Sequence, residues 1–307
     1  MNKVKAKSAH FIKLGGGGDF EEECILHDQT IKLGFHNPLH SECLAGKWDE
    51  VRDYWLEQGK TKGKATEITN QIKTFYESDQ ETLWITFFRR RMYWCFAKKG
   101  VVELSDGYRI RNVEGKWSCH DIEGHSLMLE NLSGRLTKVR GFRGTICSVK
   151  EFDYLIRRIN HQKLPEVQKA EDTLAALLRD IELLIKNLTW QDFELLVDLI
   201  FTHAGWQRIG TLGKTEKSID LDLMSPVTGC RAFVQVKSKA NKTVFENYIE
   251  QYRNMDEFDE MYFVVHTRDN FLKKWQGEPD IKLWDVATLS KLVVNSGLIS
   301  WLIKKAS

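Results

Sequence analysis

Three residues of this chain have types and spacing that suit metal-assisted hydrolysis, namely Asp220, Gln235 and Lys237. Oxygen ligands from Asp220, the Gln235 side chain and the Val236 carbonyl would suit Mg²⁺, which prefers hard oxygen donors and keeps several waters. Mn²⁺ is an expected substitute. Lys237 is a compact cation that would orient or help deprotonate an attacking water beside such an ion. The same residue types also meet by chance in strands, so the elements that position them decide the interpretation.

The chain around these residues is typical of two paired strands. Residues 219–223 alternate between apolar and acidic side chains, which is the period of two of a half-buried strand. A turn signal at 226–229 is followed by a second alternating run at 231–237, rich in β-forming residues. The stretch from Ser218 to Lys239 therefore predicts a hairpin, in which the glutamine and the lysine of the second strand share a face.

A helix is predicted directly before the hairpin. Residues 189–205 carry apolar side chains at helical spacing, with Thr189 as a capping residue and Gly205 as a stop. Glu194 lies beside the apolar stripe, where its carboxylate would reach the surroundings of the metal or a second ion.

The order of helix, Gly-Trp turn, aspartate strand and Gln-x-Lys strand resembles the PD-(D/E)xK nuclease superfamily, most closely its Mrr-like restriction endonuclease branch. The resemblance covers about residues 165–305. The superfamily is named for an acidic residue where this chain has glutamine, and the Mrr-like branch is known for glutamine there. The resemblance implies Glu194 as an accessory acid, Asp220 as a metal ligand, Gln235 in the second ligand position and Lys237 as the catalytic lysine.

Composition indicates an ordinary globular protein. The 307 residues favour about two domains, with 42% hydrophobic and 29% charged residues. No apolar run is long enough to cross a membrane, and a cytoplasmic location is expected. Six cysteines without a CxxC pair suit reduced thiols. The net charge is only +2, from 45 basic and 43 acidic residues, so a nucleic-acid-binding surface must be a local patch.

The first half of the chain opens with a predicted strand, Gly-rich turn, short helix and second strand over residues 9–35. The four glycines at 15–18 lack the Gly-Lys-Ser/Thr of a phosphate loop, which favours a turn for close backbone packing or approach to a ligand. This stretch resembles the opening of PUA-like modules related to EVE and YTH domains, which often precede Mrr-like nucleases. The resemblance implies a small β-barrel that holds a flipped or splayed base in an aromatic-lined pocket.

Aromatic residues are dense in this half, and most of them are expected in the core. Runs at 82–88 and 91–97, followed by shorter ones at 101–104, 108–113 and around Trp117, predict barrel-like strand spacing. A base-reading cage needs two or three aromatic faces and a hydrogen-bonding group for the base edge. The candidates for this cage are Phe35, Trp84, Trp94 and Trp117.

Basic residues gather near the end of the first half, in SGRLTKVRGFRGT. They form either a solvated face or a phosphate-contacting strip, in which the backbone amides of Gly141 and Gly144 would assist. PUA-like readers end in a comparable segment. The residues of this strip are Arg135, Lys138, Arg140 and Arg143.

A zinc site is a weaker hypothesis, since the spacing of the candidate ligands matches no strong zinc pattern and loop histidines are common without metal. The candidates are His36, His40, Cys43, Cys119, His120 and His125.

The two halves join between residues 150 and 165. A short helix is predicted at 151–162, and Pro165 opens a long amphipathic helix. Beyond the hairpin the pattern predicts a helix at 243–255, strands at 261–266 and 281–284, and two closing helices, the first capped by Asp285. The predicted architecture is an α+β PUA-like β-barrel reader domain over 1–150, a linker over 151–164, and an α/β nuclease domain of the PD-(D/E)xK type over 165–307.

Three functional hypotheses follow. The leading one is a type IV-like, modification-dependent DNA endonuclease that defends against foreign DNA, acting as a homodimer because double-strand cutting needs two active sites. The second is an RNA-directed or structure-specific nuclease. The third is a non-cleaving nucleic-acid-binding protein in which the three residues are relics.

Overall fold

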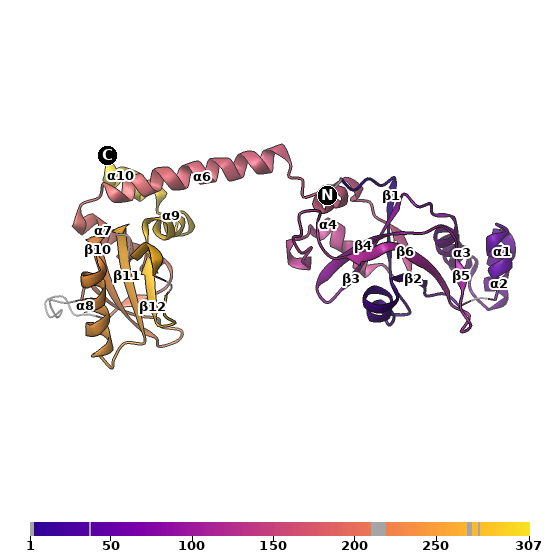
Figure 1. Cartoon of the computed structure of the whole chain (residues 1–307), viewed down its shortest axis with the longest axis horizontal. Coiled ribbons are helices and arrows are strands. Elements are labelled where there is room, and N and C mark those ends of the chain that lie inside the picture. The colour runs from indigo at the N-terminus through magenta and orange to yellow at the C-terminus, as the bar shows by residue number, and fades with distance from the viewer. Residues whose placement is uncertain (1–2, 37, 210–218, 269–271, 276) are drawn as a thin grey trace. The chain divides into compact units, whose positions relative to one another are not determined.

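The computed structural model describes residues 3–36, 38–209, 219–268, 272–275 and 277–307. The chain forms two compact units, Met1–Leu164 and Pro165–Ser307 (Figure 1). Each unit has its own sheet and its own buried cores, so each is described separately. Among the residues described, none of the helices has the length and apolar character that crossing a bilayer requires.

The first unit is built on a curled sheet with strand order β2-β6-β4-β3-β1-β7, and β5 pairs with β6 (Figure 1). Neighbouring strands are antiparallel except β1 and β3, which are parallel. The strands are β1 (Ser8–Ile12), β2 (Thr30–Leu33), β3 (Thr82–Phe88), β4 (Arg91–Ala97), β5 (Val102–Glu103), β6 (Arg109–Ser118) and β7 (Ile146–Ser148).

The β3–β4 hairpin has the bounds that the sequence predicts for it. Its turn residues Arg89 and Arg90 have φ angles of 46° and 61°. Two left-handed residues match the twist of the flanking strands, which is why such turns join tight hairpins. The runs expected at 108–113 and around Trp117 form the single strand β6.

The sheet of the first unit is open rather than a closed barrel, since β2 and β7 end the strand order among the residues described. At the β7 edge the Gln71 side chain of α3 accepts hydrogen bonds from Thr145 N (2.6 Å) and Ile146 N (2.8 Å). A helix thus satisfies backbone amides at an edge that another strand would otherwise pair with, which removes the need for closure.

Helices cover both faces of this sheet. The second and third helices contribute Val51, Ile72 and Phe75 to the core on one face, and the fifth contributes Leu155 and Ile159 to the core on the other. The segment expected to be a linker, 151–164, thus packs into the first unit. The helices are α1 (His40–Leu44), α2 (Trp48–Glu57), α3 (Lys62–Glu77), α4 (Gly134–Thr137) and α5 (Phe152–Ile159), with helical turns at Glu23–Asp28, Leu129–Asn131 and Lys138–Gly141.

The second unit has strand order β12-β11-β10-β9-β8. The strands β10, β11 and β12 are mutually parallel, whereas β9 is antiparallel to both β10 and β8. Parallel strands are usually covered by helices on both faces, and this sheet follows that rule. The strands are β8 (Gln207–Arg208), β9 (Leu221–Met224), β10 (Arg231–Ala240), β11 (Glu260–Arg268) and β12 (Ile281–Trp284).

Alternate residues of β10 face two different helical layers. Val234 and Val236 pack with α6, α7, α9 and α10, while Phe233 packs with α8. Side-chain caps begin three of these helices, with Thr189, Asn241 and Asp285 accepting from backbone amides. The helices are α6 (Pro165–Lys186), α7 (Trp190–His203), α8 (Lys242–Arg253), α9 (Val286–Asn295) and α10 (Ile299–Ala306), with a short turn at Leu272–Lys274.

Candidate active site

The register of the β9–β10 hairpin brings the three chemistry-bearing residues together. Leu221 pairs with Val234, so Asp220 lies one step beyond the ladder and opposite Gln235. The Asp220 Oδ2 atom accepts hydrogen bonds from the Gln235 Nε2 atom, from Val236 N at 2.7 Å and from Lys237 Nζ at 3.3 Å. Three donors thus converge on one carboxylate oxygen, which concentrates positive potential where the carboxylate sits.

Gln235 is 1% exposed, and its Oε1 atom has no hydrogen-bond partner. A buried acceptor without a partner costs about 1–3 kcal/mol, so it needs an explanation such as a missing cation or water. The Val236 amide points at Asp220, and in a strand the carbonyl of the same residue faces the same side. Asp220, the Gln235 amide oxygen and the Val236 carbonyl therefore fit a hard divalent cation such as Mg²⁺.

Lys237 lies on the same face of β10 as Gln235, two residues further on. Its side chain is 30% exposed, and the Nζ atom lies 5.3 Å from the ring centroid of Tyr248 on α8. The aromatic face and the Asp220 carboxylate hold the ammonium group at the edge of the site, accessible to a substrate.

Glu194 is half-buried on α7, where Phe193 and Val197 face the core. Burial, and then the negative charge of Asp220, raise the pKa of Glu194 above its ordinary value, against the opposing pull of Lys237 and Arg208. The charges that act on Glu194 are those of the hairpin site, so the structure brings this helix residue into its electrostatic neighbourhood.

Two contacts around the hairpin escape sequence reasoning. Arg208 on β8 donates to the Asp220 carbonyl at 3.3 Å, and Tyr248 flanks Lys237. Their spacing in the sequence does not predict these contacts. Arg208 reaches the site because β8 pairs with β9, and Tyr248 reaches it because of the position of α8. Ile219 packs with the α8-side core, not with Leu221, because β9 begins only at Leu221. Ser218, the first residue of the expected stretch, lies outside the described residues.

The site thus combines a carboxylate, an amide oxygen and a lysine on a β-hairpin that helices cover. Residues 185–293 match the model of a family described as restriction endonuclease, the Mrr catalytic domain. The match includes Glu194, Asp220, Gln235 and Lys237, and it supports an Mrr-like PD-(D/E)xK nuclease in the second unit. No curated protein and no solved structure matches the chain.

The four aromatic residues expected to form one base cage are not brought together. Trp84 is completely buried, and Trp117 is 7% exposed with its Nε1 atom donating to the Thr30 carbonyl. Trp94 packs with the core on the opposite face of the sheet from Trp84, and Phe35 contacts Trp55. The structure does not gather the four candidates in one place, because strand alternation sends Trp84 and Trp94 to opposite faces of the sheet.

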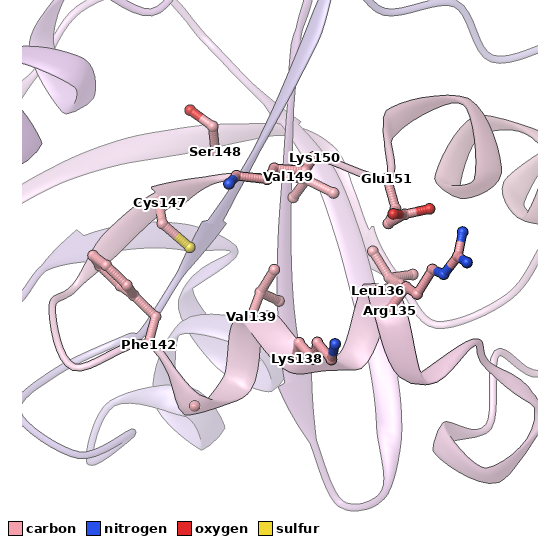
Figure 2. A pocket seen from close by; sticks show the side chains of 11 residues that line it. Arg135, Leu136, Lys138, Val139, Phe142, Cys147, Ser148, Val149, Lys150 and Glu151 are labelled. Atoms are coloured by element: carbon pink, nitrogen blue, oxygen red, sulfur yellow. The ribbon is translucent and has the colours of Figure 1, made fainter.

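The four basic residues expected to contact phosphate are all exposed, and two of them border a hollow of about 740 Å³ (Figure 2). Arg135 and Lys138 lie on its helical side, with Lys150 also on the rim. Figure 2 shows the Val139 and Phe142 side chains on the same side of the hollow as Lys138, across from the strand that carries Cys147 to Val149. Of the four expected phosphate contacts, Arg140 and Arg143 do not line it, and Arg140 instead lies over the Phe87 ring at 5.7 Å.

The six residues weighed as zinc ligands do not gather in one place. His40 bonds the Tyr76 hydroxyl at 2.8 Å, and His36 packs edge-on against Tyr108. Within the described parts of the chain, the group of potential metal ligands contains His125 but none of the other five. Sequence spacing misses this group because its members, Asp121, His125 and His161, come from two distant segments.

Proposed function

We propose that the protein is a Mg²⁺-dependent DNA endonuclease that acts on foreign DNA after its first unit recognises a modified base. The observation that carries the nuclease part is the Asp220 carboxylate with three converging donors beside the orphaned Gln235 Oε1 atom. The family match over residues 185–293 supports the same activity. Modification dependence rests on the presence of a second, separate unit with its own candidate binding surface.

In this function Asp220, Gln235 and the Val236 carbonyl hold the cation. When bound, the ion polarises the scissile phosphate and lowers the pKa of a water ligand. Lys237 orients the attacking water and offsets the negative charge that develops on the phosphate. Burial and the charge of Asp220 raise the pKa of Glu194. Its carboxyl group therefore takes part in proton exchange with solvent or supports a second ion.

The rim and floor of the hollow in the first unit support nucleic-acid contact. Arg135 and Lys138 are exposed cations beside apolar lining residues that include Val139 and Phe142. Cations fix a phosphate backbone, while an aromatic ring stacks with a base without hydrogen bonding to it. Arg140 and Arg143 extend the positive surface beyond the hollow. Cutting both strands of a duplex requires two copies of the second unit, so the active form is a homodimer.

The deciding experiment incubates the purified full chain and Mg²⁺ with three substrates of the same sequence. These are DNA with modified cytosines, unmodified DNA and RNA. Cleavage of modified DNA alone is the expected result, and the Lys237→Ala protein controls for a contaminating nuclease. Cleavage of RNA in preference to DNA would establish the RNA-directed alternative. Metal-independent binding without cleavage of any substrate would establish a binding protein.

A salt titration tests the phosphate-contacting surface separately. Each neutralised phosphate contributes roughly −0.9 to the slope of log affinity against log salt concentration for duplex DNA. Arg135→Ala and Lys138→Ala are each expected to flatten that slope by about this amount. Lys60→Ala, at an exposed lysine that does not line the hollow, is the matched control. If the two variants give the same salt dependence of DNA affinity as the control, Arg135 and Lys138 do not contact DNA phosphates.

A further inference from the structure

Three potential metal ligands converge in the first unit, and none of them lines the hollow. The ligand atoms of Asp121, His125 and His161 all lie within 4.8 Å of one another. The His161 Nδ1 atom is 2.6 Å from Asp121 Oδ2, and the His125 Nδ1 atom is 3.4 Å from Asp121 Oδ1. One carboxylate therefore faces two imidazole nitrogens, one on each oxygen.

The backbone holds the carboxylate in place before any ion binds. The Asp121 side chain is only 5% exposed, and its Oδ1 atom accepts from the amides of Glu123 at 3.0 Å and His125 at 2.9 Å. Ile122 N donates to the Ile159 carbonyl at 2.9 Å, which joins this loop to the end of α5. The site is thus a preformed turn docked on a helix end, and its anchor is a nearly buried charge.

His161 adopts a backbone conformation that glycine and asparagine adopt more readily than histidine does. Its φ angle of 50° lies in the left-handed region, which costs energy for a residue with a Cβ atom. The strained backbone places the His161 ring against the His125 ring, with centroids 4.6 Å apart and planes 21° from parallel. Two imidazole rings thus lie side by side against one carboxylate.

We propose that Asp121, His125 and His161 form a binding site for a first-row transition-metal dication, with Zn²⁺ as the representative ion. Imidazole and carboxylate ligands bind Zn²⁺ at about 2.0–2.2 Å in tetrahedral geometry, so ligand atoms stand roughly 3.3 Å apart. The separation of 3.4 Å between Asp121 Oδ1 and His125 Nδ1 is close to that value, and the His161 side chain is 42% exposed. A water fills the fourth position.

The donor set separates this site from the one on the β9–β10 hairpin. Two nitrogen donors favour Zn²⁺, Ni²⁺ or Cu²⁺, whereas the oxygen donors around Asp220 favour Mg²⁺. The ion would tie the loop that follows β6 to the segment that follows α5, immediately before the first unit ends at Leu164. Its effect is structural, since it joins two segments about forty residues apart in sequence.

Equilibrium dialysis of the chelator-treated full chain against Zn²⁺, with excess Mg²⁺ to occupy the oxygen-donor site, tests the proposal. Wild type is expected to hold one Zn²⁺ more than His125→Gln or His161→Asn. Asparagine is chosen at 161 because it tolerates the left-handed backbone. His203→Gln, an exposed histidine of the second unit that bonds the Leu199 carbonyl, is the matched control and should bind zinc as wild type does.

Two further readouts keep the result clear of misfolding. Circular dichroism in the absence of metal should be the same for all four proteins, and Zn²⁺ should raise the melting temperature of wild type and His203→Gln only. Co²⁺ in place of Zn²⁺ should give visible absorption that the two site variants lack. Equal zinc binding by wild type and both site variants, or no binding by wild type, would overturn the proposal.

Discussion

Two groups of buried polar side chains, one in each unit, form their hydrogen bonds in opposite ways. In the first unit, Arg109 and Arg111 are at most 1% exposed. Arg109 donates to Glu103 at 2.7 Å and to the Gly107 carbonyl, and Arg111 donates to the carbonyls of Phe75 and Lys98 at 3.1–3.2 Å. Each guanidinium links separate segments, and burial lowers the pKa of Arg111.

In the second unit, the polar groups around the buried Gln235 side chain meet at one point. Three donors converge on a single oxygen of Asp220, while the Gln235 Oε1 atom is left without a partner. The arginines of the first unit spread their hydrogen bonds over carbonyls and a carboxylate, which braces the fold. Convergence with an unmet acceptor, rather than burial by itself, therefore distinguishes a site from a structural network.

The largest expected effect tests the convergent site. Asp220→Asn removes the charge that holds the cation, and Lys237→Ala removes the cation that orients water, so each should lower the cleavage rate by about 10²- to 10⁴-fold. Lys239→Ala, an exposed lysine two residues along the same strand, is the control and should cleave at nearly the wild-type rate. Cleavage rates are measured on the preferred substrate, with melting temperature as a check on folding. Full activity in either site variant would show that the chemistry lies elsewhere.

The second prediction concerns the aromatic core of the first unit. Trp84→Ala should lower the free energy of unfolding by about 3–5 kcal/mol, because it opens a cavity at a completely buried position. It should not change the ratio of affinities for modified and unmodified DNA. Trp190→Ala is the control, since that side chain is 60% exposed in the second unit. Denaturant midpoints give the stability, and a loss of discrimination without a loss of stability would restore Trp84 as a base-binding residue.

What the sequence predicts well is local. Alternation at 219–223 and 231–237 is enough to place Asp220 opposite Gln235, because hairpin partners are close in sequence and the register follows from the turn. Capping at Thr189 and Asp285 is likewise local, and both residues cap helices in the structure. Asp220 and Gln235, two of the metal ligands expected at the hairpin, thus lie in contact in the structure.

What the sequence does not predict depends on which face or edge distant segments share. Trp84 and Trp94 are both candidates for the base-reading cage, but their positions in paired strands send them to opposite faces. Barrel closure was expected from strand spacing, whereas Gln71 on a helix caps the β7 edge from 74 residues away. The Asp121 and His161 pair is 40 residues apart and depends on how α5 docks. Non-local packing decides each of these cases.

A third prediction sharpens the role of the orphaned acceptor. Gln235→Glu replaces the unpartnered amide oxygen with a charged ligand. The attraction between this unit charge and a dication exceeds about 1.4 kcal/mol even at an effective dielectric constant of about 20, and 1.4 kcal/mol corresponds to a tenfold change in affinity. Mg²⁺ affinity, measured by calorimetry, should therefore rise at least about tenfold. Without metal the variant should be less stable than wild type, because Gln235 Nε2 now donates to Asp220 and two carboxylates would meet there. An unchanged metal affinity would remove Gln235 from the ligand set.

The smallest expected effect is the pH dependence that Glu194 gives the second unit. Its pKa is raised above the ordinary value of 4.5 by burial and by Asp220, so the unfolded chain loses this proton at lower pH than the folded chain does. The free energy of unfolding therefore falls as pH rises from about 4.5 through the raised pKa. Below pH 4.5, where Glu194 is protonated in both the folded and the unfolded chain, this residue does not lower the free energy of unfolding. Glu194→Gln should match wild type at a pH below 4.5 and be more stable at neutral pH, by less than about 1 kcal/mol because solvent screens a half-buried group. Urea unfolding of the metal-free protein across this range measures the difference, with the exposed Glu257→Gln in the same unit as the control. A variant that is less stable than wild type at neutral pH would mean that Glu194 is held by favourable contacts rather than crowded by Asp220.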